Sequence, residues 1–204
     1  MNNDLDDKPL ECLSDRTALI LIDLQKAIDD PVWAKVGPRN NPDAEQAVVR
    51  LLAAWRRAGW PIFHVCHDST SPVSTYRPGQ PGNAFKPEAM PLAGEPVVAK
   101  HGHSAFVGTD LEVQLRRAAI GSLVIVGVIT NNSVEATVRH GADLGFSILL
   151  PEDACFTFAR LDGAGRLWSA AEVHALSLSN LDGGYCQVTS SARVLASLNA
   201  ASAA

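Results

Sequence analysis

The stretch TALILIDLQ at residues 17–25 decides the fold. Its first six residues, Thr17–Ile22, are apolar or β-branched, do not alternate with polar residues, and are followed directly by Asp23. A short aliphatic run of this kind is typical of a strand buried on both faces, as in a parallel sheet. Parallel sheets bind ligands beyond the carboxyl ends of their strands, so Asp23 is a candidate functional residue.

The same pattern returns along the chain and alternates with helical periodicity. Further strands are expected at 61–65, 123–128, 146–150 and 185–189, and helices at 43–58, 109–118, 133–144 and 169–181. Strand–helix alternation predicts an α/β fold in which a mostly parallel central sheet is covered by helices on both faces. We expect one domain over residues 1–204, with 1–14 as an N-terminal extension. Residues 69–99, rich in proline and glycine, are expected to form a long loop that walls or covers a site.

Composition argues against several classes of protein. The net charge is −5, and the 17 Lys and Arg residues are scattered, so neither nucleic acid nor an anionic membrane is an expected partner. The longest apolar run, at 123–129, is far shorter than the ~20 residues that span a bilayer, and the acidic N-terminus does not resemble a signal peptide. We therefore expect a soluble, cytoplasmic protein. Its four cysteines lack close spacing, which predicts free, mostly buried thiols rather than a zinc site or disulfides.

Polar residues follow the predicted strands at three places: Asp23, the pair His67-Asp68, and the segment GVITNNS at 127–133. A helix that begins near Ser133 would offer free backbone N–H groups to a nucleophile and to an oxyanion. Position alone also allows ordinary roles. Asp23 and Ser133 could be helix caps, Lys100 a solvated lysine, and His67 a structural histidine.

The chain as a whole resembles the isochorismatase-like cysteine hydrolases, from about residue 17 to residue 195. The resemblance is carried by seven segments in the family's order and spacing: ALILIDLQ (18–25), HVCHDS (64–69), PGNAF (81–85), GEPVVAKHGHSAFVGTDLEVQLR (94–116), VIVGVITNNSVEATVRHGADLGF (124–146), EDA (152–154) and LSNLDGGYCQVTSS (178–191). It implies a three-layer α/β fold and hydrolysis of a small amide, carbamoyl or ureido compound.

The resemblance also implies a catalytic triad. The family's Asp corresponds to Asp23, its Lys to Lys100, and its nucleophilic Cys to Ser133. A cis peptide between Val128 and Ile129 is expected, with the backbone N–H groups of Ile129 and Ser133 forming the oxyanion hole. In the family mechanism the Asp takes the thiol proton, the Lys stabilises charge, and the thiolate attacks an amide carbonyl to give a thioester that water hydrolyses.

Ser133 departs from the family pattern, and a hydroxyl is a much weaker nucleophile than a thiolate. Three explanations stay open. The one we favour is a deliberate Cys→Ser replacement that inactivates the enzyme. The others are a natural serine with weak or altered hydrolysis, and a non-amidase role, either vinyl-ether hydrolysis with Asp23 as the acid or small-molecule binding without catalysis.

The remaining expectations concern ligands and partners. Residues 67–69, His-Asp-Ser, lack the Asp-x-His pair with which related nicotinamidases bind metal, so no metal is expected, and no glycine-rich phosphate loop predicts a cofactor. A homo-oligomer, dimer or tetramer, is the family's usual state. Five residues near the triad positions are candidate substrate contacts: Gln25, Trp33, Tyr76, Phe106 and Asn132.

Overall fold

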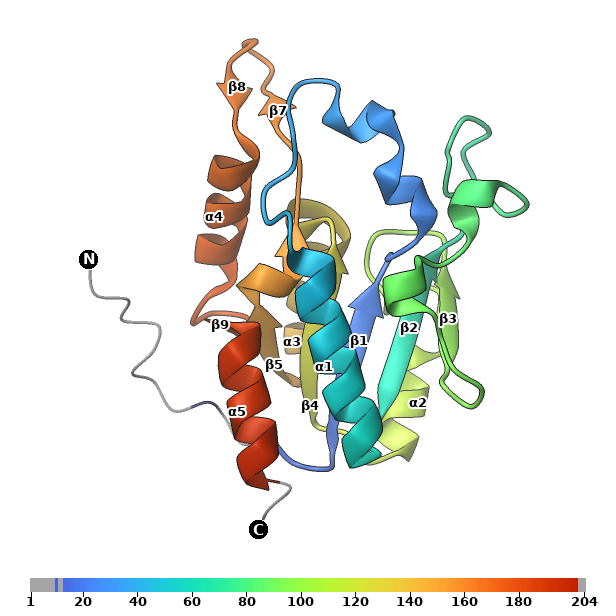
Figure 1. The fold of residues 1–204 in the computed structure, drawn as a ribbon, viewed down its shortest axis with the longest axis vertical. Helices are drawn as coiled ribbons and strands as arrows, with labels where there is room; N and C mark the ends of the chain where they lie inside the picture. Colours follow the sequence, from blue (N-terminus) through green and yellow to red (C-terminus); the bar gives the residue numbers. More distant parts are fainter. Residues whose placement is uncertain (1–9, 11–12, 202–204) are drawn as a thin grey trace.

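A parallel β-sheet forms the centre of the computed structural model, which describes residue 10 and residues 13–201 (Figure 1). Its path runs in the order β3-β2-β1-β4-β5-β9, and the short β6 pairs beside β4; every pairing in this sheet is parallel. The strands are β1 (Thr17–Ile22), β2 (Ile62–His67), β3 (Val97–Lys100), β4 (Ser122–Val128), β5 (Ser147–Pro151), β6 (Cys155–Phe156) and β9 (Gln187–Thr189). The sheet confirms the predicted fold class.

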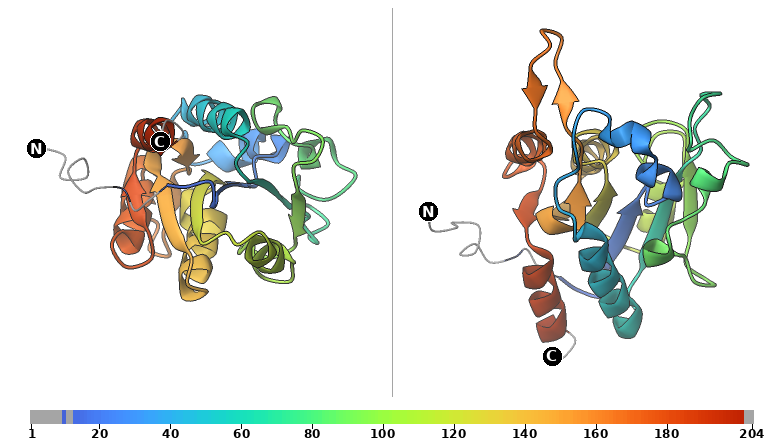
Figure 2. Two further views of the ribbon diagram at one scale, coloured as in Figure 1. Left: turned by 90° about the horizontal axis from the view of Figure 1, so that it is seen from below. Right: turned by 45° about the horizontal axis from the view of Figure 1, so that its top comes forward.

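Helices cover both faces of the sheet and complete the three layers (Figure 2). The helices are α1 (Ala44–Ala58), α2 (Leu111–Arg117), α3 (Glu135–Asp143), α4 (Ala170–Leu181) and α5 (Ser191–Ala201). Buried side chains of α1 and α5 share one apolar cluster with Leu19 and Leu21 of β1. Those of α2, α3 and α4 share a second cluster with Ile20 and Ile22, whose side chains point to the opposite face. Every residue of β1 is therefore buried, as the run at 17–22 predicts.

Helix α1 shows how local sequence produces this packing. Its buried residues recur at helical spacing and include Val48, Leu51 and Trp55. The helix ends at Gly59, which adopts the left-handed conformation that glycine tolerates best (φ 66°). The Trp55 indole N–H donates a hydrogen bond to the Thr17 carbonyl oxygen at 3.1 Å, which ties the helix to the start of β1.

Three regions differ from the sequence-based expectation. The expected loop at 69–99 contains two short 3₁₀ turns, Pro81–Asn83 and Pro87–Ala89, and runs into the edge strand β3, which was not predicted. The C-terminal helix α5 was not predicted either. Two short strands, β7 (Arg160–Leu161) and β8 (Leu167–Trp168), form an antiparallel ribbon that projects beyond the carboxyl ends of the sheet strands (Figure 1).

Two further expectations concern single features. Cys66, Cys155 and Cys186 are buried free thiols, as predicted, whereas Cys12 lies outside the described residues, as does most of the expected extension at 1–14. In the part of the chain that the structure describes, no helix combines the length and apolar character needed to cross a membrane.

Candidate active site

Asp23, Lys100 and Ser133 meet at the carboxyl end of the sheet. The Lys100 ammonium donates to Oδ2 of Asp23 at 2.8 Å, to the Gly102 carbonyl oxygen at 3.1 Å and to Oγ of Ser133 at 3.4 Å. Asp23, Lys100 and Ser133 are 5%, 1% and 7% exposed. Sheet topology explains this convergence, because β3, β2, β1 and β4 are consecutive parallel neighbours and each ends at the same edge.

Asp23 lies directly after β1 in a left-handed backbone conformation (φ 53°). Its backbone N–H still donates to the Val65 carbonyl oxygen at 2.9 Å, so the turn begins only after the last pairing with β2. Burial raises the pKa of Asp23, and the Lys100 ammonium and the nearby Ser133 hydroxyl act in the opposite direction. Its second carboxylate oxygen, Oδ1, is buried and has no hydrogen-bond partner among the described residues. The carboxylate thus keeps one oxygen available as a proton acceptor.

Ser133 lies on a wide helical turn, η6 (Thr130–Val134), between β4 and α3. The peptide bond between Val128 and Ile129, at the entry to this turn, is cis, as the resemblance predicts. The turn closes through the Ile129 carbonyl oxygen, which accepts from the N–H groups of Asn132 at 3.0 Å and Val134 at 3.4 Å. Ser133 is therefore presented at the amino end of α3 rather than inside a regular helix.

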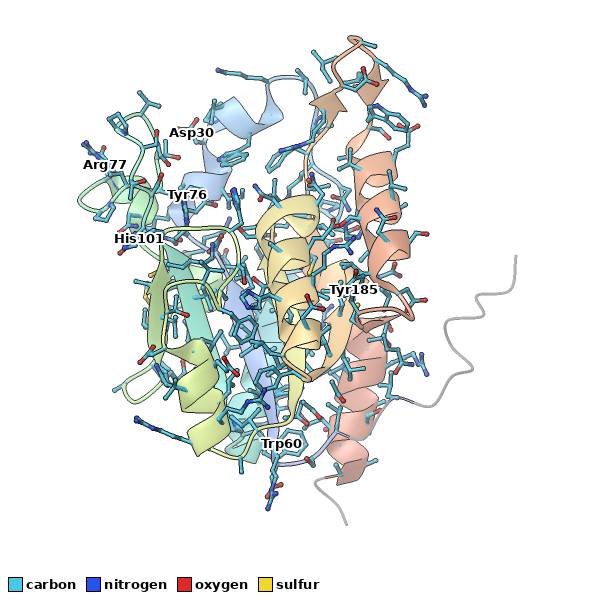
Figure 3. All side chains as sticks on the ribbon, turned by 180° about the vertical axis from the view of Figure 1, so that it is seen from behind. Asp30, Trp60, Tyr76, Arg77, His101 and Tyr185 are labelled. Atoms are coloured by element: carbon cyan, nitrogen blue, oxygen red, sulfur yellow. The ribbon has the colours of Figure 1, made fainter. Side chains whose placement is uncertain are left out.

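Tyr76 and His67 border the Asp23–Lys100 pair. The buried Tyr76 hydroxyl donates to the Asp23 carbonyl oxygen at 3.4 Å, and its ring meets the His67 ring edge-on, with centroids 5.7 Å apart. Burial, together with the charge of Lys100, lowers the pKa of His67 to about 4, so the imidazole is neutral at physiological pH. Figure 3 shows Tyr76 and His101 together at this end of the sheet, far from Trp60 at the opposite end.

Gln25 is placed differently from the expected substrate contact. Its side chain is completely buried, and its amide nitrogen donates to the carbonyl oxygens of Asn83 at 2.7 Å and His67 at 3.2 Å. Its amide oxygen accepts from the His67 N–H at 2.7 Å. Gln25 therefore joins the end of β2 to the loop around Asn83, and its amide groups are occupied by protein backbone.

The structure places the other three expected substrate contacts in different surroundings. The Trp33 ring packs near Tyr76 and Phe158, and its indole N–H donates to the Ala27 carbonyl oxygen at 2.9 Å. Asn132 is half-buried and directly precedes Ser133. Phe106 instead belongs to the apolar core between α2 and α3, where its ring stacks on Phe146 at 5.8 Å, so the structure gives it a packing role.

Sequence reasoning missed the contacts that support the turn from behind. Oγ1 of the buried Thr130 lies 2.8 Å from Nδ1 of His174, a buried histidine of α4. Oδ1 of Asn131 accepts from the Thr157 hydroxyl at 2.6 Å. The one available signal was a histidine within the otherwise largely apolar helix 170–181, and that signal alone does not specify a role.

Side chains that could bind a metal ion are not clustered in the part of the chain that the structure describes. Across residues 13–201 and residue 10, no group of three or more His, Cys, Asp or Glu side chains is arranged to hold a metal ion. The expectation that no metal takes part stays a prediction.

Comparisons with known proteins show the family and the fold. The isochorismatase domain model matches residues 17–193. A crystal structure of a hydrolase of the isochorismatase family from Chromobacterium violaceum is 57% identical, with a TM-score of 0.90 over 95% of this chain and 98% of that chain. The isochorismatase family protein YrdC of Bacillus subtilis is 36% identical over 169 residues, 83% of this chain and 89% of the relative. Nicotinamidase 3 of Arabidopsis thaliana is 26% identical over 151 residues, 68% of this chain and 71% of the relative. The chain belongs to the isochorismatase family of hydrolases.

Proposed function

We propose that this protein hydrolyses a small amide, carbamoyl or ureido compound through Asp23, Lys100 and position 133. The observation that carries the proposal is the position of the Lys100 ammonium, which lies 2.8 Å from Oδ2 of Asp23 and 3.4 Å from Oγ of Ser133 in a buried site. A buried cation that touches both a carboxylate and a hydroxyl can stabilise negative charge on either as a proton moves between them.

The proposed reaction assigns one role to each group. Asp23 takes the proton of the nucleophile at position 133, which attacks the substrate's carbonyl carbon, and the carbonyl oxygen becomes an oxyanion bound by the N–H groups of Ile129 and Ser133. The C–N bond then breaks, and Asp23 returns the proton to the departing nitrogen. A water molecule, deprotonated by Asp23, attacks the resulting ester or thioester, releases the acid and restores the nucleophile.

Position 133 controls the rate in this proposal. A serine hydroxyl is far less acidic than a thiol, and Asp23 is a weak base for it even with its pKa raised by burial. We therefore expect slow turnover in the serine form, whereas Ser133→Cys restores a nucleophile that this site can ionise.

A panel of small amides, carbamates and ureides with ammonia detection tests the proposal. The protein as given, Ser133→Cys, and Ser133→Cys combined with Asp23→Asn are compared side by side. We expect ammonia release from at least one substrate with Ser133→Cys, little with serine, and none above background with the Asp23→Asn combination. Equal release with and without the Asp23 carboxylate would overturn the assignment of the base.

One observation favours a second candidate function. Burial raises the pKa of Asp23, and a carboxyl group that holds its proton more firmly can act as a general acid. An acid at this position could protonate a vinyl ether and needs no nucleophile at position 133. This candidate predicts that the serine form is already active on a vinyl ether, that Ser133→Cys brings no gain, and that Asp23→Asn abolishes the reaction.

A further inference from the structure

We propose that His174 is a positioning residue, which acts through Thr130 to hold the turn that carries position 133 and the oxyanion donors. The inference rests on the proposed function, because it concerns the same turn. Thr130 directly follows Ile129, one of the proposed oxyanion donors, and is wholly buried. Its Oγ1 is hydrogen-bonded to Nδ1 of His174 at 2.8 Å, although the two residues are 44 positions apart in the sequence.

The imidazole of His174 is held on its far side as well. The ring is hydrogen-bonded to the Glu152 backbone. Its Nε2 also lies 3.4 Å from Nδ2 of Asn41, whose two N–H groups donate to the carbonyl oxygens of Glu152 at 2.8 Å and Cys155 at 2.7 Å. The ring therefore lies between the turn and the chain segment that follows β5. Because burial lowers the pKa of His174 to about 4, the ring is uncharged at neutral pH and needs no acidic partner.

Helix α4, which carries His174, is itself anchored. Ser169 and Glu172 form reciprocal hydrogen bonds that cap its first turn. Further along, the Ser177 hydroxyl donates to Oε2 of Glu135 at 2.6 Å, and Glu135 is the first residue of α3. A displacement of the turn and α3 relative to α4 would stretch the Ser177–Glu135 hydrogen bond together with the His174 bond.

Other side chains fix different parts of the same turn. Asn131 is held by the Thr157 hydroxyl, and the Ser133 carbonyl oxygen accepts from the Thr137 hydroxyl at 2.7 Å. His174 acts at the amino end of the turn, next to Ile129. Oxyanion donors are effective only when fixed at the right distance from the developing charge. Loss of the His174 bond should therefore affect the reactivity of position 133 and not only stability.

Thiol alkylation in the Ser133→Cys background reads out that reactivity without a known substrate. The probe is iodoacetamide, and peptide mass spectrometry follows the rate of alkylation at position 133. The pH midpoint of that rate reports the pKa of the introduced thiol. Two variants test the two ring nitrogens of His174 separately. In His174→Asn the side-chain amide takes the place of Nδ1, so the bond to Thr130 can persist, whereas in His174→Gln the amide takes the place of Nε2.

We expect His174→Gln to slow alkylation at neutral pH roughly fivefold, the scale of one lost hydrogen bond, and to raise the pH midpoint. His174→Asn should restore most of the rate. Thr130→Val should match His174→Gln and Thr130→Ser should match His174→Asn, and the double variant His174→Gln with Thr130→Val should be no slower than either alone. Leu176→Ala, on the exposed side of the same helix, is the matched control and should leave the rate unchanged.

The results separate a failure of the proposed function from a failure of the role proposed for His174. If the Ser133→Cys thiol has an ordinary pH midpoint before His174 is altered, the proposed function fails. If that midpoint is low but His174→Gln changes only the midpoint of thermal unfolding and leaves the alkylation profile unchanged, the proposed function stands and the role of His174 is overturned.

Discussion

The ammonium nitrogen of Lys100 lies 2.8 Å from Oδ2 of Asp23, and both side chains are almost completely buried. A buried ion pair is weak evidence for stability, because removing two charges from water costs about as much as their attraction returns. The buried pair lies next to Ser133 at the amino end of α3. A role in the proposed reaction therefore explains it better than a contribution to stability. Because each buried charge is stabilised by the other, removal of one of them should destabilise the folded protein.

Lys100→Met should destabilise the protein by about 3–5 kcal/mol, because it leaves the Asp23 carboxylate buried without its partner. The double variant Asp23→Asn with Lys100→Met should cost much less than the single change, since no unpaired charge remains and asparagine tolerates the left-handed backbone at this position. Urea unfolding of the parent, the single variant and the double variant measures both effects. An unaltered unfolding free energy in Lys100→Met would show that the Lys100 ammonium does not stabilise the buried Asp23 carboxylate.

Gly127→Ala should be severely destabilising. A Cβ atom at this position would lie 2.2 Å from the Ile22 carbonyl oxygen, and the backbone angle (φ 123°) is one that L-residues rarely adopt. Gly121→Ala, just before β4, is a control because no atom outside the neighbouring residues lies within 4 Å of its added Cβ. Soluble yield and thermal unfolding should separate the two variants, and similar behaviour would contradict the close approach of β4 to β1.

Gln25→Leu should cost about 1–3 kcal/mol, because it leaves the backbone groups of His67 and Asn83 buried without their partners. Gln46→Leu, at an exposed position of α1, is the control and should be nearly neutral. If Gln25→Leu instead left stability unchanged but weakened substrate binding, the original expectation of a substrate contact would be right.

Stability should fall as the pH is lowered from about 6.5 toward 4. The pKa of His174 is lowered to about 4 in the folded protein, against an ordinary value near 6.5, so within this window the unfolded chain binds a proton that the folded chain does not. The contribution is complete above the ordinary pKa and is lost through this range. His174→Asn should therefore show a flatter dependence of unfolding free energy on pH, whereas Leu176→Ala, at an exposed position of the same helix, should retain the parent slope.

Much of the fold could be predicted because its central strands are short aliphatic runs, which are typical of strands buried in a parallel sheet. Thr17–Ile22 is wholly buried and was predicted to the residue. β3 was missed because it is an edge strand: Val97 is 49% exposed, and the run of four residues sits at the end of a proline-rich segment. Its identity as a strand comes from pairing with β2, which local sequence does not report.

The candidate site was predictable in part for the same reason. Asp23 was found from its place after a buried strand, and Lys100 and Ser133 from the resemblance. The hydrogen bonds of Gln25 could not be predicted, because its partners lie 42 and 58 positions away in the sequence, and its contact with substrate stays a prediction. His174 was missed because the contact that gives it a role exists only after α4 packs on the turn.

The pH dependence of alkylation in Ser133→Cys tests the central claim most directly, namely that this site activates the side chain at position 133. The parent's own buried thiols are internal references, because burial raises the pKa of Cys66 to about 11 and those of Cys155 and Cys186 to about 12. We predict that the introduced thiol reacts fastest of these and with a pH midpoint well below the ordinary value of about 8.5. A midpoint at or above that value, with a rate no greater than that of Cys66, would contradict the account.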